Sequence, residues 1–266
     1  MIGASDGSTG FTQATDQVGT IAASLDPQLD PSGLQNNGGP TQTIALLPDS
    51  PAIDKGTSNG LTGDLRTDQR GPGFPRTFNY PSVTNGTGAN CADIGAFELL
   101  TPFSVWRKVH GAAPFDINIP LGGTAAIECR TGGVNSDHEV ITTFPFLVAS
   151  VTSASVTTGT GSVSSASVNG SQVTTNLTAV ANAQTIVLTL FGVSNGTNTS
   201  NVKIPMGVLL GDTNGDRFIN SGDALQPRNR SGQISDPANF RSDVNTDGFV
   251  NSGDTTVVRS RSGTTI

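Results

Sequence analysis

Cysteine, aromatic residues and charge are all scarce in this sequence. Two cysteines, Cys91 and Cys129, occur among its 266 residues, so no more than one intrachain disulfide can form, and their spacing leaves open whether they are bridged. Aromatic residues account for 5% and charged residues for 13% of the chain, while Gly, Ser, Thr and Asn are abundant. This composition disfavours helical bundles and is typical of turn-rich β structure.

Long apolar runs and excess positive charge are also missing. No run is long enough to cross a bilayer, and a net charge of -7 with a pI near 4.6 argues against a patch that neutralises phosphates. We therefore predict no membrane span and no nucleic-acid partner. The first five residues lack the basic start and apolar centre of a secretion signal, so we expect that an export signal lay upstream and was removed.

Residues arranged like an active site are scarce as well. Residues 3–7 match the Gly-x-Ser-x-Gly motif of a nucleophile elbow, but that motif requires a preceding strand, and too little chain comes before it. His110 and His138 lie in different segments, without Glu or Cys at ligand spacing, which argues against a zinc site. We predict no catalytic residues and a protein that is not an enzyme.

Two acidic loops with the same pattern lie near the C-terminus. Oxygen-bearing side chains occupy loop positions 1, 3, 5, 9 and 12 of both copies, and position 7 offers a backbone carbonyl. A hard cation such as Ca²⁺ takes roughly six to eight oxygen ligands, which a tight loop presents at alternate positions. The predicted ligands of two Ca²⁺ ions are Asp212, Asn214, Asp216, Phe218, Asn220 and Asp223 in the first loop, and Asp243, Asn245, Asp247, Phe249, Asn251 and Asp254 in the second.

The two loops belong to a longer repeat. They start 31 residues apart, and the motif Arg-x-Arg-Ser-Gly follows each loop at the same offset. A repeat of this length is an architectural signal and argues against a chance match of polar residues. Position 8 is apolar in both copies, Ile219 and Val250, which predicts that the loops pair with each other through a short β-bridge above a shared core.

These residues resemble a type I dockerin, the duplicated calcium-loop module of secreted bacterial assemblies. The resemblance implies two Ca²⁺ ions, a compact helical module and a β-sandwich partner of the cohesin kind. It also implies partner contacts at loop positions 10 and 11, which are Ser221, Gly222, Ser252 and Gly253. The first copy departs from the pattern in two ways. Position 6, usually glycine, is Arg217, and Pro227 falls within the following helix, which we expect to be short or kinked.

A second, separate resemblance covers roughly residues 20–100. Short apolar pieces broken by turn signals look like the closing segment of bacterial surface proteins built on a right-handed parallel β-helix, in the motifs at residues 35–43, 51–54, 68–71 and 93–97. The best strand candidates are residues 41–47 and 93–98. The acids of this region are candidates either for further calcium sites or for turn caps: Asp26, Asp30, Asp54, Asp64, Asp68 and Asp93.

Residues 102–210 have the rhythm of a β-sandwich of immunoglobulin or cohesin type. Alternation favours strands at residues 115–119, 125–129 and 173–177, and two apolar runs, 141–148 and 186–191, are candidates for central strands. Glycine-rich turn signals separate them at intervals of about ten residues. A further apolar segment, 202–210, runs into the first calcium loop without a flexible linker, and Pro205 predicts that it is an edge strand or ends there.

The predicted fold is therefore mainly β, in three domains: a terminal β-solenoid-like segment (1–101), a β-sandwich (102–210) and a small α-helical module with two calcium loops (211–266). Calcium loops suit an extracellular or cell-surface location. Our first functional hypothesis is a calcium-binding structural protein that associates with itself, head to tail, into a filament or surface layer. The alternatives are an anchoring module that docks a cohesin-like receptor, and the accessory end of a polysaccharide-acting β-helix enzyme.

Overall fold

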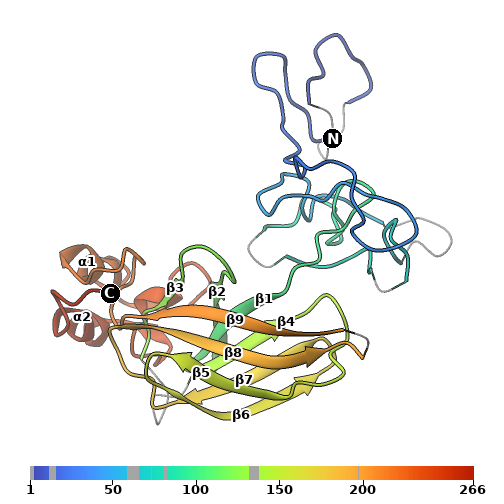
Figure 1. The fold of residues 1–266 in the computed structure, drawn as a ribbon. Helices are drawn as coiled ribbons and strands as arrows, with labels where there is room; N and C mark the ends of the chain where they lie inside the picture. The colour runs from blue at the N-terminus through green and yellow to red at the C-terminus, as the bar shows by residue number, and fades with distance from the viewer. Residues whose placement is uncertain are drawn as a thin grey trace. The chain divides into compact units, whose positions relative to one another are not determined.

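A computed structural model describes residues 3–11, 16–58, 66–72, 74–80, 83–131, 138–196 and 198–266. The chain forms two compact units, Met1–Thr101 and Pro102–Ile266, drawn in Figure 1. The residues of the predicted sandwich and of the predicted calcium module lie together in the second unit. The mainly β class is confirmed, and the two α-helices of the described residues lie in the C-terminal region.

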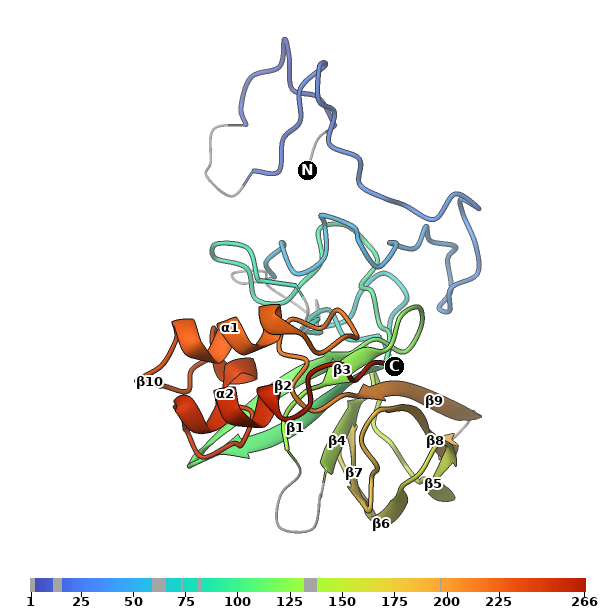
Figure 2. The same ribbon diagram turned by 90° about the vertical axis from the view of Figure 1, so that its left-hand side faces the viewer.

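Two β-sheets make up residues 103–208 of the second unit, which we call the two-sheet body (Figures 1 and 2). One sheet has the strand order β2-β1-β4-β7-β6, all antiparallel, and the other has the order β3-β9-β8-β5, in which β3 and β9 are parallel. The strands are β1 (Phe103–His110), β2 (Ala113–Ile119), β3 (Ala126–Glu128), β4 (His138–Thr143), β5 (Ser153–Thr158), β6 (Ser162–Asn169), β7 (Gln172–Thr178), β8 (Gln184–Ser194) and β9 (Thr199–Val208).

The inner faces of the two sheets share one apolar core. Trp106 on β1 is fully buried and contributes to the same cluster as Val140, Leu188 and Ile204. Alternation placed β2, β3 and β7 within a few residues of their true bounds. In β7, and at the end of β2, every second side chain is buried, whereas β3 buries two successive side chains. The strand predicted at 141–148 is β4, which begins earlier, at His138, and ends at Thr143.

Pro205 lies within β9, although β9 has neighbours on both sides. It pairs with Val187 of β8, while β3 pairs only with Met206, Gly207 and Val208. Proline lacks the N–H that a second neighbour would need. Pro205 therefore occupies the part of β9 that β3 does not reach, which is locally an edge.

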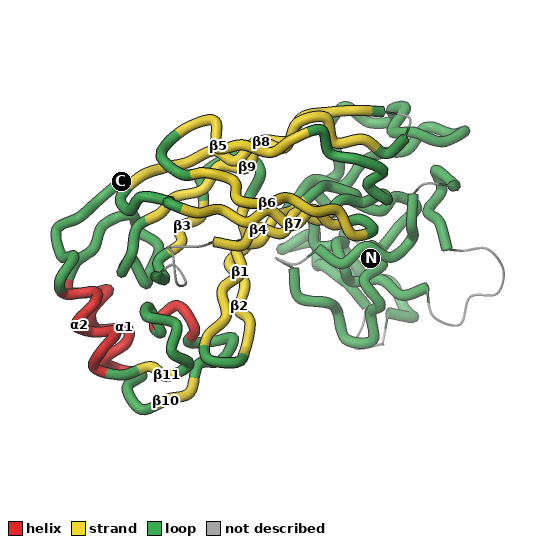
Figure 3. Tube along the Cα trace, turned by 90° about the horizontal axis from the view of Figure 1, so that it is seen from below, coloured by secondary structure: helices red, strands yellow, loops and turns green. Residues whose placement is uncertain are grey.

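Two short helices and two small β-pairings form the calcium module. Its elements are α1 (Ser221–Asn229), β10 (Gln233–Ile234), the 3₁₀ helix η1 (Phe240–Ser242), β11 (Phe249–Val250) and α2 (Ser252–Arg259); Figure 3 shows α1 beside α2 and β10 beside β11. Ile219, Val244 and Val258 are fully buried in a small core, which Ile127 of the two-sheet body also joins. Pro227, in the last turn of α1, does not shorten this helix relative to α2.

The prediction that the two loops pair with each other is wrong. Phe218 in the first loop forms a bridge with Thr265, after α2, whereas β11 in the second loop pairs with β10, after α1. Each loop therefore pairs with the segment that follows the helix of the other repeat. This exchange ties both repeats into one unit and still buries Ile219 and Val250.

The first unit is built from turns and isolated bridges. Its described residues contain no strand, so the strands predicted at 41–47 and 93–98 are wrong; within the first segment, Thr43 and Leu46 form single bridges with Gln35 and Leu29. A solenoid is not seen in these residues. Buried carboxylates here accept backbone N–H groups that a neighbouring strand would accept in a sheet. Glu98 accepts those of Phe78 and Asp93 at 3.0 and 2.9 Å.

The candidate calcium ligands of this unit act as caps and backbone acceptors where they are described. Asp26 and Asp30 accept N–H groups two residues ahead, at 2.9 and 2.8 Å, and Asp68 forms a buried ion pair with Arg70 at 2.6 Å. Asp54 and Asp93 accept the N–H groups of Tyr80 and Leu99. Asp64 lies outside the described residues. These contacts match the turn-cap alternative.

Cys91 and Cys129 are both free thiols, and Cys129 is fully buried. Among the described residues, the structure contains no helix with the length and apolar character that a bilayer span requires.

Candidate metal centre

The first predicted loop brings its carboxylates together. One oxygen from each of Asp212, Asp216 and Asp223 lies within 4.8 Å of the others, with Asp212 and Asp223 buried and Asp216 exposed. All three are hard oxygen donors, and no sulfur or nitrogen ligand belongs to the cluster. The donor set therefore fits Ca²⁺ or another hard cation and does not fit zinc.

The backbone of this loop wraps around its first aspartate. Asp212 accepts N–H groups from Gly215 and Asp216 on Oδ1 and from Arg217 on Oδ2, at 2.8 to 3.1 Å. Burial raises the pKa of the Asp212 carboxyl, and the neighbouring charges of Asp223 and Asp216 raise it further. A bound cation would offset both effects, because it stabilises the ionised carboxylates that repel one another.

Positions 9 and 12 also start the helices. Asn220 accepts the N–H of Gly222 at 2.6 Å, and Asp223 accepts the N–H of Asn220 at 2.9 Å, which completes a capping box at α1. Asn251 and Asp254 form the same box at α2. The predicted ligands at position 9 are therefore helix caps, and we expect them to reach a cation through water, as position 9 often does.

The second loop repeats several hydrogen bonds of the first. Asn245 donates its amide to Asp247 at 2.9 Å, as Asn214 does to Asp216, and the N–H of Phe249 reaches Asp247 as that of Phe218 reaches Asp216. Within the described part of the chain, however, its three carboxylates do not converge to the distance seen in the first loop. One oxygen of Asp243 is instead engaged by neighbouring side chains.

The two buried aspartates of the second loop differ in charge environment. Burial raises the pKa of Asp254, as it does for Asp212. Burial acts on Asp243 in the same direction, but hydrogen bonds from His110 and Ser235 outweigh it and lower the pKa of Asp243. The second loop therefore keeps its first ligand ionised with help from outside the loop.

The difference at loop position 6 follows from how each loop meets the two-sheet body. In the first loop, Arg217 adopts a φ of 72° and donates to the carbonyl of Ala125 at 2.6 Å. In the second, a Cβ on Gly248 would lie 3.3 Å from the Cα of Gly111, in the turn after β1. Arg217 reaches the body with its side chain, whereas Gly248 lets the body approach its backbone.

A residue of the first loop replaces a hydrogen bond that Pro227 removes from α1. Proline cannot donate to the carbonyl four residues earlier, which belongs to Asp223. That carbonyl accepts the hydroxyl of Thr213 at 3.1 Å instead. The second copy has Val244 in place of Thr213 and Val258 in place of Pro227, so the two differences occur together.

Sequence reasoning missed three residues that support the loops. His110 contacts Asp243 across 133 positions of sequence, and Ser235 contacts the same carboxylate. Arg241 in η1 donates to the carbonyls of Asp212, Thr213 and Ile127 at 3.1 to 3.3 Å. No spacing rule joins such distant residues. The one available signal was the absence of a linker before Asp212, which predicted a fixed contact between module and body.

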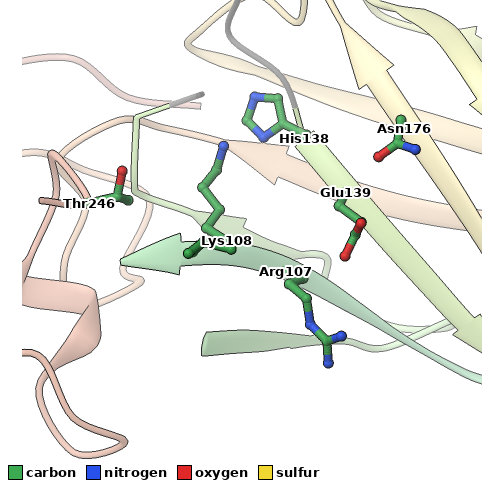
Figure 4. A pocket seen from close by; sticks show the side chains of 7 residues that line it. Arg107, Lys108, His138, Glu139, Asn176 and Thr246 are labelled. Carbon is green, nitrogen blue, oxygen red and sulfur yellow. The ribbon is translucent and has the colours of Figure 1, made fainter. Parts of the chain in front are cut away.

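Two pockets lie close to the loops. The first, of about 300 Å³, lies between the two helices and includes Ser221, one of the predicted partner contacts; it is lined by Asn220, Ser221, Ala224, Leu225, Arg228, Arg259 and Ser262. The second, of about 260 Å³, lies where the second loop meets β1, β4 and β7. In this pocket Lys108 extends toward His138, and Thr246 contributes from the calcium loop (Figure 4).

Two matched oxygen-rich loops, each leading into a capped helix around one core, define a duplicated calcium-loop module. Residues 210–261 match the family model of the dockerin type I domain, so the predicted dockerin-like module is confirmed. Dockerin domains bind calcium and dock onto cohesins, typically in extracellular assemblies. No curated protein and no solved structure matches the chain.

Proposed function

We propose that this chain is an extracellular anchoring protein whose C-terminal module binds two Ca²⁺ ions and docks a cohesin-like β-sandwich receptor. The observation that supports it best is the convergence of Asp212, Asp216 and Asp223 at the start of the helix that lines the interhelical pocket. Calcium binding would fix the first loop and, through the capping box at Asn220, the start of that helix.

The docking surface in this proposal is the pocket between α1 and α2. Leu225, which exposes 45% of its surface, lines this pocket together with the cationic side chains of Arg228 and Arg259. Ser221 and Ser252, at the predicted partner positions, are also exposed. The two-sheet body contacts the module through Ile127, whose side chain joins the core of the module and whose carbonyl accepts a hydrogen bond from Arg241 of η1. An exposed apolar side chain framed by cations suits a partner surface with an apolar centre and an acidic rim.

Calcium would act as a folding cofactor of the module. The apolar core shared by its two repeats is small, and three carboxylates of one charge sign converge in the first loop. Ions that bind the folded state and not the unfolded state stabilise it, by about 2.7 kcal/mol per site at a hundredfold excess over Kd. The second loop has an equivalent donor set, and a second ion is part of the proposal.

The rest of the chain is assigned a non-enzymatic, structural role. We propose that the two-sheet body is a β-sandwich of immunoglobulin or cohesin type that presents the module in a fixed orientation, and that residues 1–101 end a β-solenoid. Self-association into a filament or surface layer stays a prediction, as does membership of a polysaccharide-acting enzyme. The docking hypothesis is preferred because the interhelical pocket contains a predicted partner contact.

The docking proposal is tested by measuring association of the full chain with a panel of cohesin domains, in millimolar calcium and in EDTA. We expect calcium-dependent binding that Leu225→Glu abolishes and that Asp49→Asn, an exposed change outside the module, leaves intact. Sedimentation of the chain alone is the companion measurement. Concentration-dependent assembly without any cohesin, together with no binding across the panel, would favour the filament hypothesis and reject docking.

A further inference from the structure

The two calcium loops hold their first aspartates by different means. The donors to Asp212 are all backbone N–H groups of its own loop. Asp243 accepts the equivalent backbone bond from Gly248 on Oδ2, at 2.9 Å, but the same oxygen also accepts from His110 and from Ser235. Its Oδ1 accepts one N–H, that of Asp247, at 3.2 Å.

The partners of His110 fix its tautomer. Its Nδ1 lies 2.9 Å from Asp243, an acceptor, and its Nε2 lies 3.2 Å from Nη1 of Arg130, which has no acceptor capacity. A neutral imidazole with its proton on Nδ1 satisfies both contacts. The ring therefore donates to the calcium-loop aspartate and accepts from an arginine of the two-sheet body.

Arg130, which donates to the His110 ring, is itself fixed by hydrogen bonds. It forms a bidentate ion pair with Glu128, at 2.7 Å for both bonds, and its remaining N–H groups reach His110 and the carbonyls of Phe115 and Trp106. Glu128 and Arg130 are fully buried, and His110 exposes 2% of its surface. Since all five donors of the guanidinium have acceptors, Arg130 and the imidazole it contacts have no alternative arrangement of equal quality.

The backbone reinforces this contact. The N–H of Gly111, next to His110, donates to the carbonyl of Thr246 in the second loop at 3.1 Å, and the N–H of Thr131 donates to the carbonyl of Val244 at 2.7 Å. The ring of Phe240 stacks on Phe115, with centroids 5.4 Å apart. The turn after β1 is therefore anchored on the second loop independently of the histidine.

We propose that His110, assisted by Ser235, is a positioning residue of the second calcium site, so that the two-sheet body completes a site whose ligands all belong to the module. This inference rests on the proposed function. By occupying Oδ2 of Asp243, the two donors leave Oδ1 as the oxygen available to a cation and fix the rotation of the carboxylate. Partners that orient metal ligands in this way typically change metal affinity by about ten- to a hundredfold when they are removed.

The test measures calcium affinity of the second loop alone, by calorimetric titration of the full chain with Ca²⁺ in an Asp212→Ala, Asp216→Ala background. In that background we compare His110→Leu, which fills the space without donating, with His110→Asn, whose amide nitrogen restores a donor near Nδ1. Ser235→Ala removes the other donor from within the module. Val173→Ala, a core change in β7, controls for general destabilisation of the two-sheet body.

We expect His110→Leu to weaken calcium binding by about ten- to a hundredfold and Ser235→Ala to weaken it by a smaller factor, while His110→Asn recovers most of the affinity. Val173→Ala should lower the melting temperature and leave the affinity unchanged. Equal affinities in the parent background, His110→Leu and Ser235→Ala would overturn the inference and leave calcium binding intact. A parent background that binds no calcium would overturn the inference together with the second ion of the proposed function. If His110→Leu does not fold, Ser235→Ala and His110→Asn still decide the outcome.

Discussion

Glycine at position 248 has two physical reasons to be there. Its φ of 94° is a conformation that side chains other than glycine rarely adopt, and its Cα faces the turn at Gly111. Gly232 has a φ of 92° but open space around the site of a Cβ. A comparison of substitutions at Gly248 and Gly232 therefore distinguishes the effect of backbone strain from that of packing between the module and the two-sheet body.

We expect Gly248→Ala to destabilise the second unit more than Gly232→Ala does. Both changes impose the positive-φ penalty of roughly 1–2 kcal/mol, and only the first also forces the Gly111 turn away from the loop. Denaturant unfolding followed through Trp106, the one tryptophan of the chain, measures both variants. Equal losses would show that the close approach at Gly111 contributes nothing.

Ligand residues were predictable where their spacing alone defines the site. Asp212, Asp216 and Asp223 converge as the loop pattern requires, because consecutive turns of one short segment bring them together. His110 was not predictable as a partner of Asp243, since nothing in a local pattern reports a contact made by the folding of a separate element. The same holds for Arg241 and the carbonyl of Ile127.

At the scale of elements, helix α1 depends on a residue outside it. The Thr213 hydroxyl takes the place of the N–H that Pro227 lacks, on the carbonyl of Asp223. We expect Thr213→Val to cost about 1–3 kcal/mol of stability, because it leaves that carbonyl without a donor in a buried position. The double variant Thr213→Val, Pro227→Val reproduces the second repeat and should recover most of the loss.

The double variant is the decisive comparison in that experiment. Thermal unfolding of the single and double variants, with and without calcium, measures the coupling between the two positions. If the double variant is no more stable than Thr213→Val, the carbonyl of Asp223 does not account for the role of Thr213.

Strands were predictable in the two-sheet body and not in the first unit, for a physical reason. In β2 and β7 alternate side chains enter one core, and their sequence carries that period. Around Glu98 and Asp93 the backbone N–H groups bond to buried carboxylates rather than to a neighbouring strand. An apolar segment there resembles a strand in sequence although its backbone partners are side chains. The prediction that the two loops pair with each other was wrong because the repeated sequence does not indicate which segment each loop strand pairs with.

At the scale of the whole molecule, the two units should respond oppositely to pH. Burial raises the pKa of Glu98 to about 8 and that of Asp93 to about 6, so the folded first unit binds more protons than its unfolded chain. Its stability is therefore greatest below the ordinary carboxyl pKa and is lost as the pH rises through about 8. In the second unit burial, aided by Lys108, lowers the pKa of His138 to about 3. The contribution of His138 to the stability of that unit is therefore complete above the ordinary histidine pKa of about 6.5 and is lost as the pH falls from there toward about 3.

We expect the melting temperature of the second unit to fall, and that of the first to rise, between about pH 8 and about pH 5.5 in EDTA. Trp106 reports on the second unit and Tyr80, the one tyrosine, on the first. His138→Gln should flatten the dependence of the second unit. Melting temperatures that shift in the same direction for both units would contradict these assignments.

The most direct test of the account is a calorimetric titration of the full chain with calcium, paired with thermal unfolding before and after EDTA. Two ions per chain and a melting temperature of the second unit that drops on chelation are the predicted results, because both loops supply oxygen donors to a module with a small core. A chain that takes up no calcium at millimolar concentration and unfolds identically with and without EDTA would contradict the central claim.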